Sequence, residues 1–417
     1  MIDPNIDYAA SPSWDESMPA RMKWLRENAP VYWAEKCDLW VLSKYDDVVA
    51  VSKDSKLFCS GQGVRPGLEL RQGLIDEDDP HHTQLRRLIN RGFTPRMVGK
   101  LERAFEQITR STIDAIAGAG ECDFVDDIAV PLPLLLIAEM MGIREEDRHS
   151  FHRWSDAMMA GDGNFDDPEI MQRASDAFVA YSTYLTEIIE ERRASPQDDL
   201  VSILVGAKDA GVLEDFDLDS ASTDQLGGGE HAGLANDELL MMLVTLMVAG
   251  NETTRNALSG SMQLLIEHPG HRRRLIDDPS LIPVAIEELL RLVTPVHSFA
   301  RTATADTELR GQKIRKGQKV LMLYPSANRD ADVFDDPDTF ILERNPNHVA
   351  FGIGAHFCLG ANLARMELRV ALTELLRRLP DMEYSRGGPE IRPHSLVRAC
   401  DHMYVRYSPE LATRSPG

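Results

Sequence analysis

Apolar residues recur every three or four positions along most of the chain, the spacing that places them on one face of an α-helix. The longest such pattern covers residues 235–269 and is continuously apolar over 239–249. Residues 131–142 are apolar at almost every position, which predicts a helix buried on all sides. Alternating stretches within residues 29–45 and 392–407 predict short strands. The pattern therefore predicts a mainly α fold with small β-sheets.

Shorter helical patterns fill much of the remaining chain. They cover residues 13–28, 46–51, 79–88, 96–118, 145–161, 168–193, 198–211, 281–292 and 362–379. Residues 60–73 are rich in glycine and predict a loop that can move, and the acidic residues 212–234 predict a flexible surface loop. Because no linker rich in Pro, Gly and Ser divides the chain, we expect a single domain over residues 1–417.

Composition narrows the class of protein. Of the 417 residues, 43% are hydrophobic and 6% aromatic, enough for a sizeable core, and the formal net charge is -22. This acidity argues against nucleic acid as a partner, because phosphate binding needs a concentrated basic surface. No apolar run approaches the roughly 20 residues that span a bilayer, and the N-terminus lacks the features of a signal peptide. The five cysteines are scattered without a Cys-x-x-Cys pair. We therefore expect a cytoplasmic protein with no transmembrane anchor.

One cysteine stands out. Cys358 lies among Gly352, Gly354 and Gly360, directly before a predicted helix whose first amides carry partial positive charge. A lone cysteine is usually a small buried hydrophobic side chain, but this setting favours a thiolate. With no second cysteine or histidine at the spacing of a metal cage, a thiolate suits an axial haem ligand better than a zinc site.

The sequence FGIGAHFCLG at residues 351–360 resembles the Phe-x-x-Gly-x-x-x-Cys-x-Gly signature of the cytochrome P-450 superfamily, the haem-thiolate monooxygenases, in its bacterial soluble form. The resemblance implies the cytochrome P-450 fold, with a long central helix over a buried haem b (iron protoporphyrin IX). It implies that Cys358 binds the iron. The residues around it, which would contact the cofactor, are Phe351, Gly352, His356 and Gly360.

Basic residues elsewhere match the family's haem-anchoring positions. His82 and Arg86 are four apart, so they share one face of the predicted helix at 79–88 and can grip an anion. A solvated basic face is the simpler interpretation of this pair alone. The resemblance implies that His82, Arg86, Arg301 and His356 hold the haem propionates.

The polar residues that interrupt the longest helical pattern also need a reason, because a buried helix seldom contains them. The simpler explanation is that Thr253 bonds the carbonyl four residues back and bends the helix slightly. The sequence Ala-Gly-Asn-Glu-Thr-Thr is similar to the family's acid–alcohol pair, which makes Glu252 and Thr253 the proton-delivery residues. Thr245, Val248 and Ala249 lie near the face of Thr253 on helical spacing, so we expect them to approach haem or substrate.

Further positions follow from the resemblance. Glu288 and Arg291, three apart on one helix, look like the family's Glu-x-x-Arg structural pair, joined in relatives by an arginine near Arg344. His297 is either a polar contact to substrate or a hydrogen-bonded wall residue. The remaining residues expected to reach the substrate are Val296, Phe299, Leu396 and Val397.

The expected reaction inserts one oxygen atom from dioxygen into a C–H bond of a hydrophobic small molecule. Motifs such as Ala-Gly-Asn-Glu-Thr-Thr-Arg-Asn look like the branch that hydroxylates sterol side chains and branched lipids, so a steroid or terpenoid is the expected substrate. No dinucleotide-binding or iron–sulfur motif is present, so electrons must come from a separate protein. We expect a ferredoxin with its ferredoxin reductase. We expect a monomer. The cationic residues expected to form the docking face are Arg87, Arg91, Arg96, Lys100, Arg103, Arg365 and Arg369.

Other functions remain open. A peroxygenase would use hydrogen peroxide directly and would not need Glu252 and Thr253. A non-catalytic haem-binding or gas-sensing protein would not need them either. An all-α structural protein without haem would leave four propionate candidates unexplained.

Overall fold

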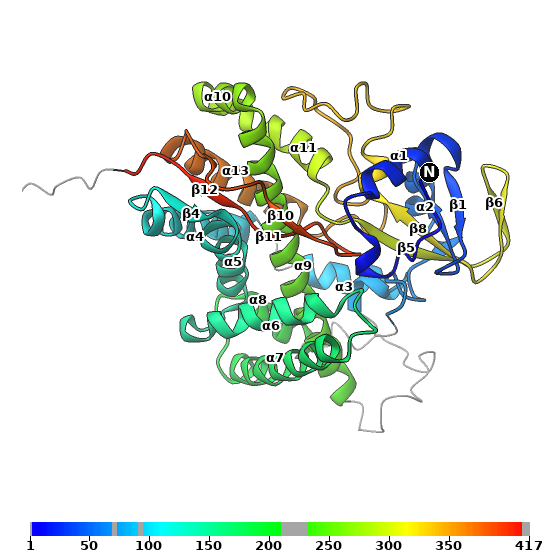
Figure 1. The fold of residues 1–417 in the computed structure, drawn as a ribbon. Helices are drawn as coiled ribbons and strands as arrows, with labels where there is room; N and C mark the ends of the chain where they lie inside the picture. The colour runs from blue at the N-terminus through cyan, green and yellow to red at the C-terminus, as the bar shows by residue number, and fades with distance from the viewer. Residues whose placement is uncertain (1, 69–72, 91–94, 210–231, 411–417) are drawn as a thin grey trace, which may run out of the picture.

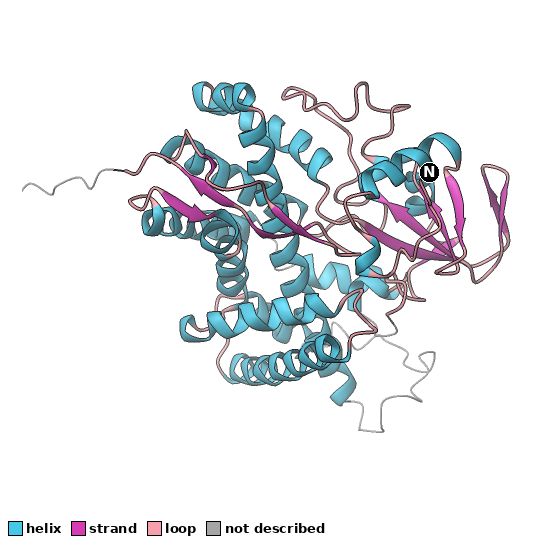
Figure 2. Cartoon of the chain, in the orientation of Figure 1, coloured by secondary structure: helices cyan, strands magenta, loops and turns pink. Residues whose placement is uncertain are grey.

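The computed structural model describes residues 2–68, 73–90, 95–209 and 232–410. Helices form one large part of the molecule, and a sheet covered by the N-terminal helices forms a smaller part beside it (Figures 1 and 2). The long helix α9 (Ala232–Glu267) runs through the middle of the helical part.

The helices match most of the predicted patterns. They are α1 (Met18–Asn28), α2 (Tyr45–Lys53), α3 (His81–Asn90), α4 (Pro95–Ile116), α5 (Pro131–Met141), α6 (Arg148–Gly161), α7 (Pro168–Ala194), α8 (Leu200–Asp209), α9, α10 (Pro269–Asp277), α11 (Ile282–Val293), α12 (Tyr324–Ala327) and α13 (Ala361–Arg378). Among the described residues, no helix has the length and apolar character needed to cross a membrane.

The strands form four sheets. They are β1 (Val31–Ala34), β2 (Leu39–Leu42), β3 (Phe58–Cys59), β4 (Glu121–Asp123), β5 (Ser298–Ala303), β6 (Thr307–Leu309), β7 (Gln312–Ile314), β8 (Lys319–Leu323), β9 (Glu383–Tyr384), β10 (Glu390–Arg392), β11 (Ala399–His402) and β12 (Tyr404–Arg406). The largest sheet has the order β1-β2-β8-β5-β3, antiparallel except for the pair β2 and β8. A second sheet has the order β4-β12-β9, and β10-β11 and β6-β7 form two-stranded sheets.

Helix α5 is buried as its sequence predicts, and it packs against α4 and α9. Pro133 lies in its first turns, where missing N–H groups cost little, and Gly142 ends it in the left-handed conformation, at φ 68°. A β-carbon on Gly250 of α9 would lie 2.2 Å from the side chain of Ile137. The glycine therefore lets these two helices approach closely.

Several helix ends differ from the predictions, and one helix was not predicted. Helix α1 begins at Met18, after a short 3₁₀ turn at Ser11–Ser13, so the predicted helix at 13–28 starts too early. Helix α9 begins at Ala232, so the last residues of the predicted 212–234 loop are helical, and residues 212–231 lie outside the described residues. Helix α10 was not predicted separately, because Pro269 was taken as the end of the long helical pattern, whereas it begins a new helix.

Candidate active site

The turn at residues 351–360 presents Cys358 at the start of α13. Gly352 and Gly354 adopt positive φ angles of 65° and 80°, a conformation that glycine adopts without strain. The Cys358 amide donates to the Phe351 carbonyl at 2.9 Å, and the Gly360 amide donates to the thiol. The half-buried sulfur is therefore held in one orientation by backbone contacts.

The electrostatics of Cys358 favour a bound cation. Burial raises the pKa of the thiol, while the Gly360 amide and the guanidinium groups of Arg86 and Arg365 lower it. Burial is the larger effect, so the thiolate needs a further positive charge. A metal ion coordinated by the sulfur would supply it.

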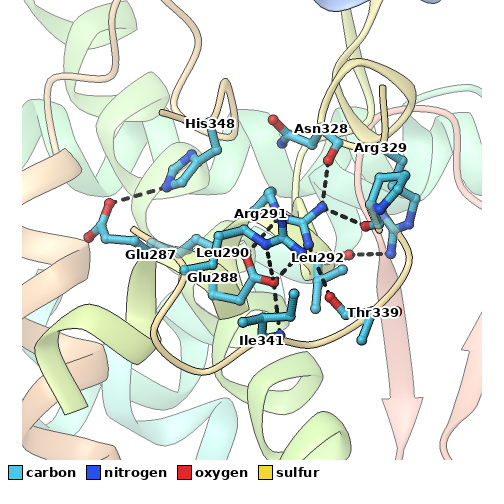
Figure 3. A network of polar contacts seen from close by, with 12 residues as sticks. Glu287, Glu288, Leu290, Arg291, Leu292, Asn328, Arg329, Thr339, Ile341 and His348 are labelled. Atoms are coloured by element: carbon cyan, nitrogen blue, oxygen red, sulfur yellow. Dashed lines mark hydrogen bonds and ion pairs between the residues drawn. The ribbon is translucent and has the colours of Figure 1, made fainter. Parts of the chain in front are cut away.

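Arg365 supports the turn from α13. Its guanidinium lies 4.6 Å from the ring centroid of Phe351 and forms two hydrogen bonds with Glu287, of 2.7 and 2.8 Å. His348 also contacts Glu287, at 3.2 Å (Figure 3). Arg365 is thus part of the support of the cysteine turn.

The structure brings the four predicted propionate residues together from α3, β5 and the turn. The rings of His82 and His356 lie 4.1 Å apart. Burial lowers the pKa of His356 to about 3, and Arg301, His82 and Arg86 lower it in the same direction. Arg86 donates to a backbone carbonyl of the turn at 2.6 Å, and Arg301 is only 5% exposed. These basic groups are close enough to repel one another.

One donor of the cluster has no partner among the described residues. Nε2 of His82 is buried without a hydrogen-bond partner. In the described part of the chain, no carboxylate forms an ion pair with Arg86, Arg301 or His356, although His82 lies 3.8 Å from Asp79. Buried cations and donors without anions are costly. The cluster would suit the anionic groups of a ligand bound beside Cys358.

One face of α9 borders open space. Thr245, Val248 and Thr253 are half-buried and Ala249 is exposed, although the neighbouring Met247 is fully buried. The four predicted residues share this face at helical spacing. The Thr253 hydroxyl donates to the Ala249 carbonyl at 2.6 Å. A helix in the middle of the molecule with a small exposed residue is suited to lie against a flat ligand.

Glu252 does not share this open face, which corrects the expectation that it faces the haem together with Thr253. Its carboxylate is 4% exposed and forms an ion pair of 2.8 Å with Arg255, one turn further along α9. Successive helix residues point about 100° apart, so Glu252 and Thr253 diverge. The acid is directed toward α6, where Asp156 lies near it.

The predicted substrate residues differ in exposure. Val296, Phe299 and Leu396 are half-buried. Val397 is 1% exposed and pairs through its backbone with Val296, so its side chain is buried within the protein, and its contact with substrate stays a prediction. His297 is a wall residue, because it bonds the His394 carbonyl at 3.0 Å and stacks on Trp14 at 4.6 Å.

Glu288 and Arg291 form the ion pair that their spacing predicts, with two contacts of 2.7 Å between fully buried side chains (Figure 3). Arg344 joins the pair at 3.1 Å from Glu288. Arg291 also donates to the carbonyls of Asn328 and Pro337, at 2.8 and 2.6 Å. The network ties α11 to the segment that precedes the cysteine turn.

Sequence reasoning missed three polar residues at the site. Ser60 contacts Nε2 of His356 at 3.0 Å. Arg255 and Asp156 surround Glu252. The spacing of Arg255 from Glu252, three residues on one helix, was a usable signal. Ser60 and Asp156 are distant in sequence, and no local pattern marks them.

Comparisons with known proteins agree with this geometry. The family model for cytochrome P-450 matches residues 15–396. The chain is 38% identical to the steroid C26-monooxygenase of Mycolicibacterium smegmatis, over 93% of this chain and 92% of the relative. It is also 38% identical to a steroid C26-monooxygenase of Mycobacterium tuberculosis, over 97% of this chain and 98% of that protein.

Solved structures show the same fold. The crystal structure of CYP109E1 from Bacillus megaterium in complex with testosterone matches with a TM-score of 0.79 and 31% identity, covering 93% of this chain and 99% of that one. The Cys358 sulfur, the basic cluster near it and the open face of α9 fit the haem iron that this family uses. The chain therefore belongs to the cytochrome P-450 family and is a haem-iron monooxygenase.

Proposed function

We propose that this enzyme hydroxylates a steroid. The observation that carries the proposal is the identity of 38% over more than nine-tenths of the chain to proteins named steroid C26-monooxygenase. A structural neighbour with testosterone bound supports the same substrate class. The half-buried Val248, Val296, Phe299 and Leu396 would offer a rigid hydrocarbon an apolar wall.

We further propose the roles of the residues that would hold the cofactor. Cys358 is the iron ligand, and the cofactor is haem b. Ala249, Phe351, Gly352 and Gly360 lie against the ring. The propionates are held by His82, Arg86, Arg301 and His356.

The haem, when bound, supplies dioxygen activation, and a thiolate ligand favours cleavage of the O–O bond. The protein's share is to position substrate, exclude water and deliver protons. Thr253 is placed to hold a proton at Oγ1, because its hydroxyl lies on the open face of α9. Glu252, the residue before Thr253 on α9, supplies protons from the side of α6. The apolar residues beside Thr253 limit stray water.

The electron donor is proposed to be a ferredoxin with its reductase. The docking face predicted from sequence is less basic than expected, because Arg365 pairs with Glu287, Arg369 with Glu102 and Lys100 with Asp198. Arg87 and Arg103 remain exposed cations. Arg91 and the side chain of Arg96 lie outside the described residues. That the protein is a monomer stays a prediction, as does its location in the cytoplasm.

Two spectra test the proposal. The reduced, carbon-monoxide-bound protein should show the strongly red-shifted Soret band of a thiolate-ligated haem. Titration with cholest-4-en-3-one or testosterone should then displace water from the iron and change its spin state. Cys358→Ser should lose the red shift, whereas Cys400→Ser, at another buried cysteine, should keep it.

The two outcomes are read separately. An ordinary imidazole-type band in the wild-type protein would remove Cys358 as the ligand. A red-shifted band with no spin-state change for any steroid, but a change with a terpenoid, would refute the steroid assignment and leave the monooxygenase intact.

A further inference from the structure

Glu252 has a carboxylate neighbour on another helix. Asp156 of α6 lies within hydrogen-bonding reach of Glu252, and Arg255 bridges the two, at 2.8 Å from Glu252 and 3.4 Å from Asp156. One residue earlier on each helix, Asn251 donates to Ser155 at 3.2 Å, and both side chains are fully buried. The two contacts fix the register of α6 on this part of α9.

The surroundings of Glu252 favour its protonated form. Burial raises the pKa of Glu252 to about 7, Arg255 lowers it, and Asp156 raises it further. A neighbouring carboxylate disfavours the ionised form of Glu252. The other charged group that faces Glu252 is Arg392 of β10, which lowers the pKa. Asn256, on α9, donates to the Glu252 backbone carbonyl at 2.8 Å.

The two carboxyl groups differ sharply in their access to water. The side chain of Asp156 is 43% exposed, whereas that of Glu252 is 4% exposed. His152, one turn earlier on α6 and 25% exposed, lies 3.4 Å from Asp156. The chain of contacts thus begins at the surface of α6 and ends at the buried acid beside Thr253.

We propose that Asp156 is the residue through which protons from solvent reach Glu252 during catalysis. The Asp156 carboxylate takes a proton from water and passes it to the Glu252 carboxylate, so Asp156 is ionised again. The Glu252 carboxylate, which is directed toward α6 in this structure, then turns toward Thr253, releases the proton and returns to its starting state. The relay consumes no electrons. The inference rests on the role proposed for Glu252, and Asp156 acts through it as a positioning and relay residue.

The first test measures protonation without turnover. In the haem-loaded resting enzyme, the infrared band of a protonated carboxyl group that disappears in Glu252→Gln is assigned to Glu252 and titrated with pH. In Asp156→Asn the like charge is gone and Arg255 acts on Glu252 alone. We expect the titration midpoint to fall by about one unit or more. Asp156→Glu should restore it.

The second test measures proton use. Asp156→Asn should form several times less product per electron pair and more peroxide, with a larger solvent isotope effect and an unchanged spin-state response to substrate. The control is Asp176→Asn, the same change on the exposed face of α7, which should match wild type. Asp156→Ser is the second variant if Asp156→Asn loads haem poorly.

Two results would overturn the relay. One is a Glu252 titration in Asp156→Asn identical to that of wild type. The other is a loss of coupling that Asp156→Glu does not rescue, which would make Asp156 a structural contact only. Because the carbon-monoxide spectrum and the steroid response do not depend on the relay, failure here is distinct from failure of the proposed function.

Discussion

Thr253 is half-buried although it lies well inside the longest helix of the chain. Its hydroxyl is already bonded to the Ala249 carbonyl, so it can accept a second hydrogen bond from a group in the open space. Thr253→Ala should leave haem content and substrate affinity unchanged, because both depend on other side chains. Product per electron consumed should fall severalfold and peroxide should rise, because a proton position is lost.

The control for this variant is Thr254→Val, since Thr254 is the adjacent threonine but is buried away from the open face, at 5% exposed. Peroxide formation and substrate consumption are measured against electron-donor oxidation. Equal coupling in Thr253→Ala and wild type would remove Thr253 from proton delivery.

Gly354 shows why the cysteine turn needs its glycines. At φ 80°, a β-carbon there would lie 2.3 Å from the Ser52 carbonyl oxygen at the end of α2. Gly354→Ala must therefore move the turn or the helix end, and we expect a loss of about 2 kcal/mol or more in unfolding free energy together with reduced haem retention. Gly388→Ala, where a β-carbon meets nothing within 4 Å, is the matched control. Equal urea midpoints for the two variants would contradict the steric argument.

The site residues that could be predicted are those within short motifs. Cys358 and Thr253 stand in segments whose neighbours in sequence are also neighbours in space, so spacing and resemblance locate them. Glu252 belongs to such a motif too, yet its direction depends on Arg255 and on Asp156 of another helix. Sequence can assign a residue to a site, but the rotamer depends on tertiary partners.

At the scale of elements, α11 shows how a helix supports chemistry that it does not perform. Glu288 and Arg291 are both 0% exposed, and each satisfies the other. Glu288→Gln would leave the Arg291 guanidinium buried with carbonyl acceptors only. Removing one partner of a buried pair typically costs about 3 to 5 kcal/mol. We expect a loss of this size, measured by urea unfolding of the haem-loaded protein.

Glu383→Gln is the exposed comparison. Glu383 pairs with Arg406, but the two side chains are 59% and 60% exposed, and such pairs contribute less than about 1 kcal/mol. A similar small effect in both variants would mean that water or a neighbouring group compensates the buried arginine.

Helices with strong periodicity, such as α5, α7 and α9, could be predicted because burial of one face or of all faces repeats along the sequence. The ends of the helices were harder to predict. Asp167 caps α7 by accepting from the amides of Glu169 and Ile170, and a cap of this kind is visible in sequence. The sheet order β1-β2-β8-β5-β3 joins strands from residues 31–59 with strands from residues 298–323, so no local pattern could reveal it.

At the scale of the whole molecule, the polar contacts of Arg65 hold together segments that are distant in sequence. Arg65 is 3% exposed and bonds Asp162 at 3.1 Å, the Ser395 hydroxyl at 3.0 Å and the Ser298 carbonyl at 3.4 Å. The described part of the predicted mobile loop at 60–73 is therefore tied to α6, β5 and the C-terminal hairpin. Glycine content alone could not reveal these contacts, because they are long-range, and the mobility of the loop stays a prediction.

Buried titratable groups also set how the whole molecule responds to pH. Burial raises the pKa of Glu367 on α13 to about 8, and one of its carboxylate oxygens has no hydrogen-bond partner. A carboxyl whose pKa is raised in the folded state stabilises the fold below the unfolded pKa, and this stabilisation is lost as pH rises through the folded pKa. Burial raises the pKa of Glu252 in the same direction, to about 7. Burial lowers the pKa of His297 to about 3, so its effect on stability varies only below about pH 6.5.

Both carboxyl groups contribute in the window from pH 6.5 to 8, as does His402, whose pKa is raised by its hydrogen bond to Asp123, so the contribution of Glu367 is read from the difference between variants. One proton lost per unfolding event changes stability by about 1.4 kcal/mol per pH unit, or about 2 kcal/mol over this window. Glu367→Gln cannot ionise, so its unfolding free energy in urea should decline with pH by that much less than that of wild type. Glu383→Gln, on the surface, should decline like wild type. Parallel pH profiles for wild type and Glu367→Gln would mean that Glu367 ionises in the folded protein at ordinary pH, and that a group not yet identified satisfies its charge.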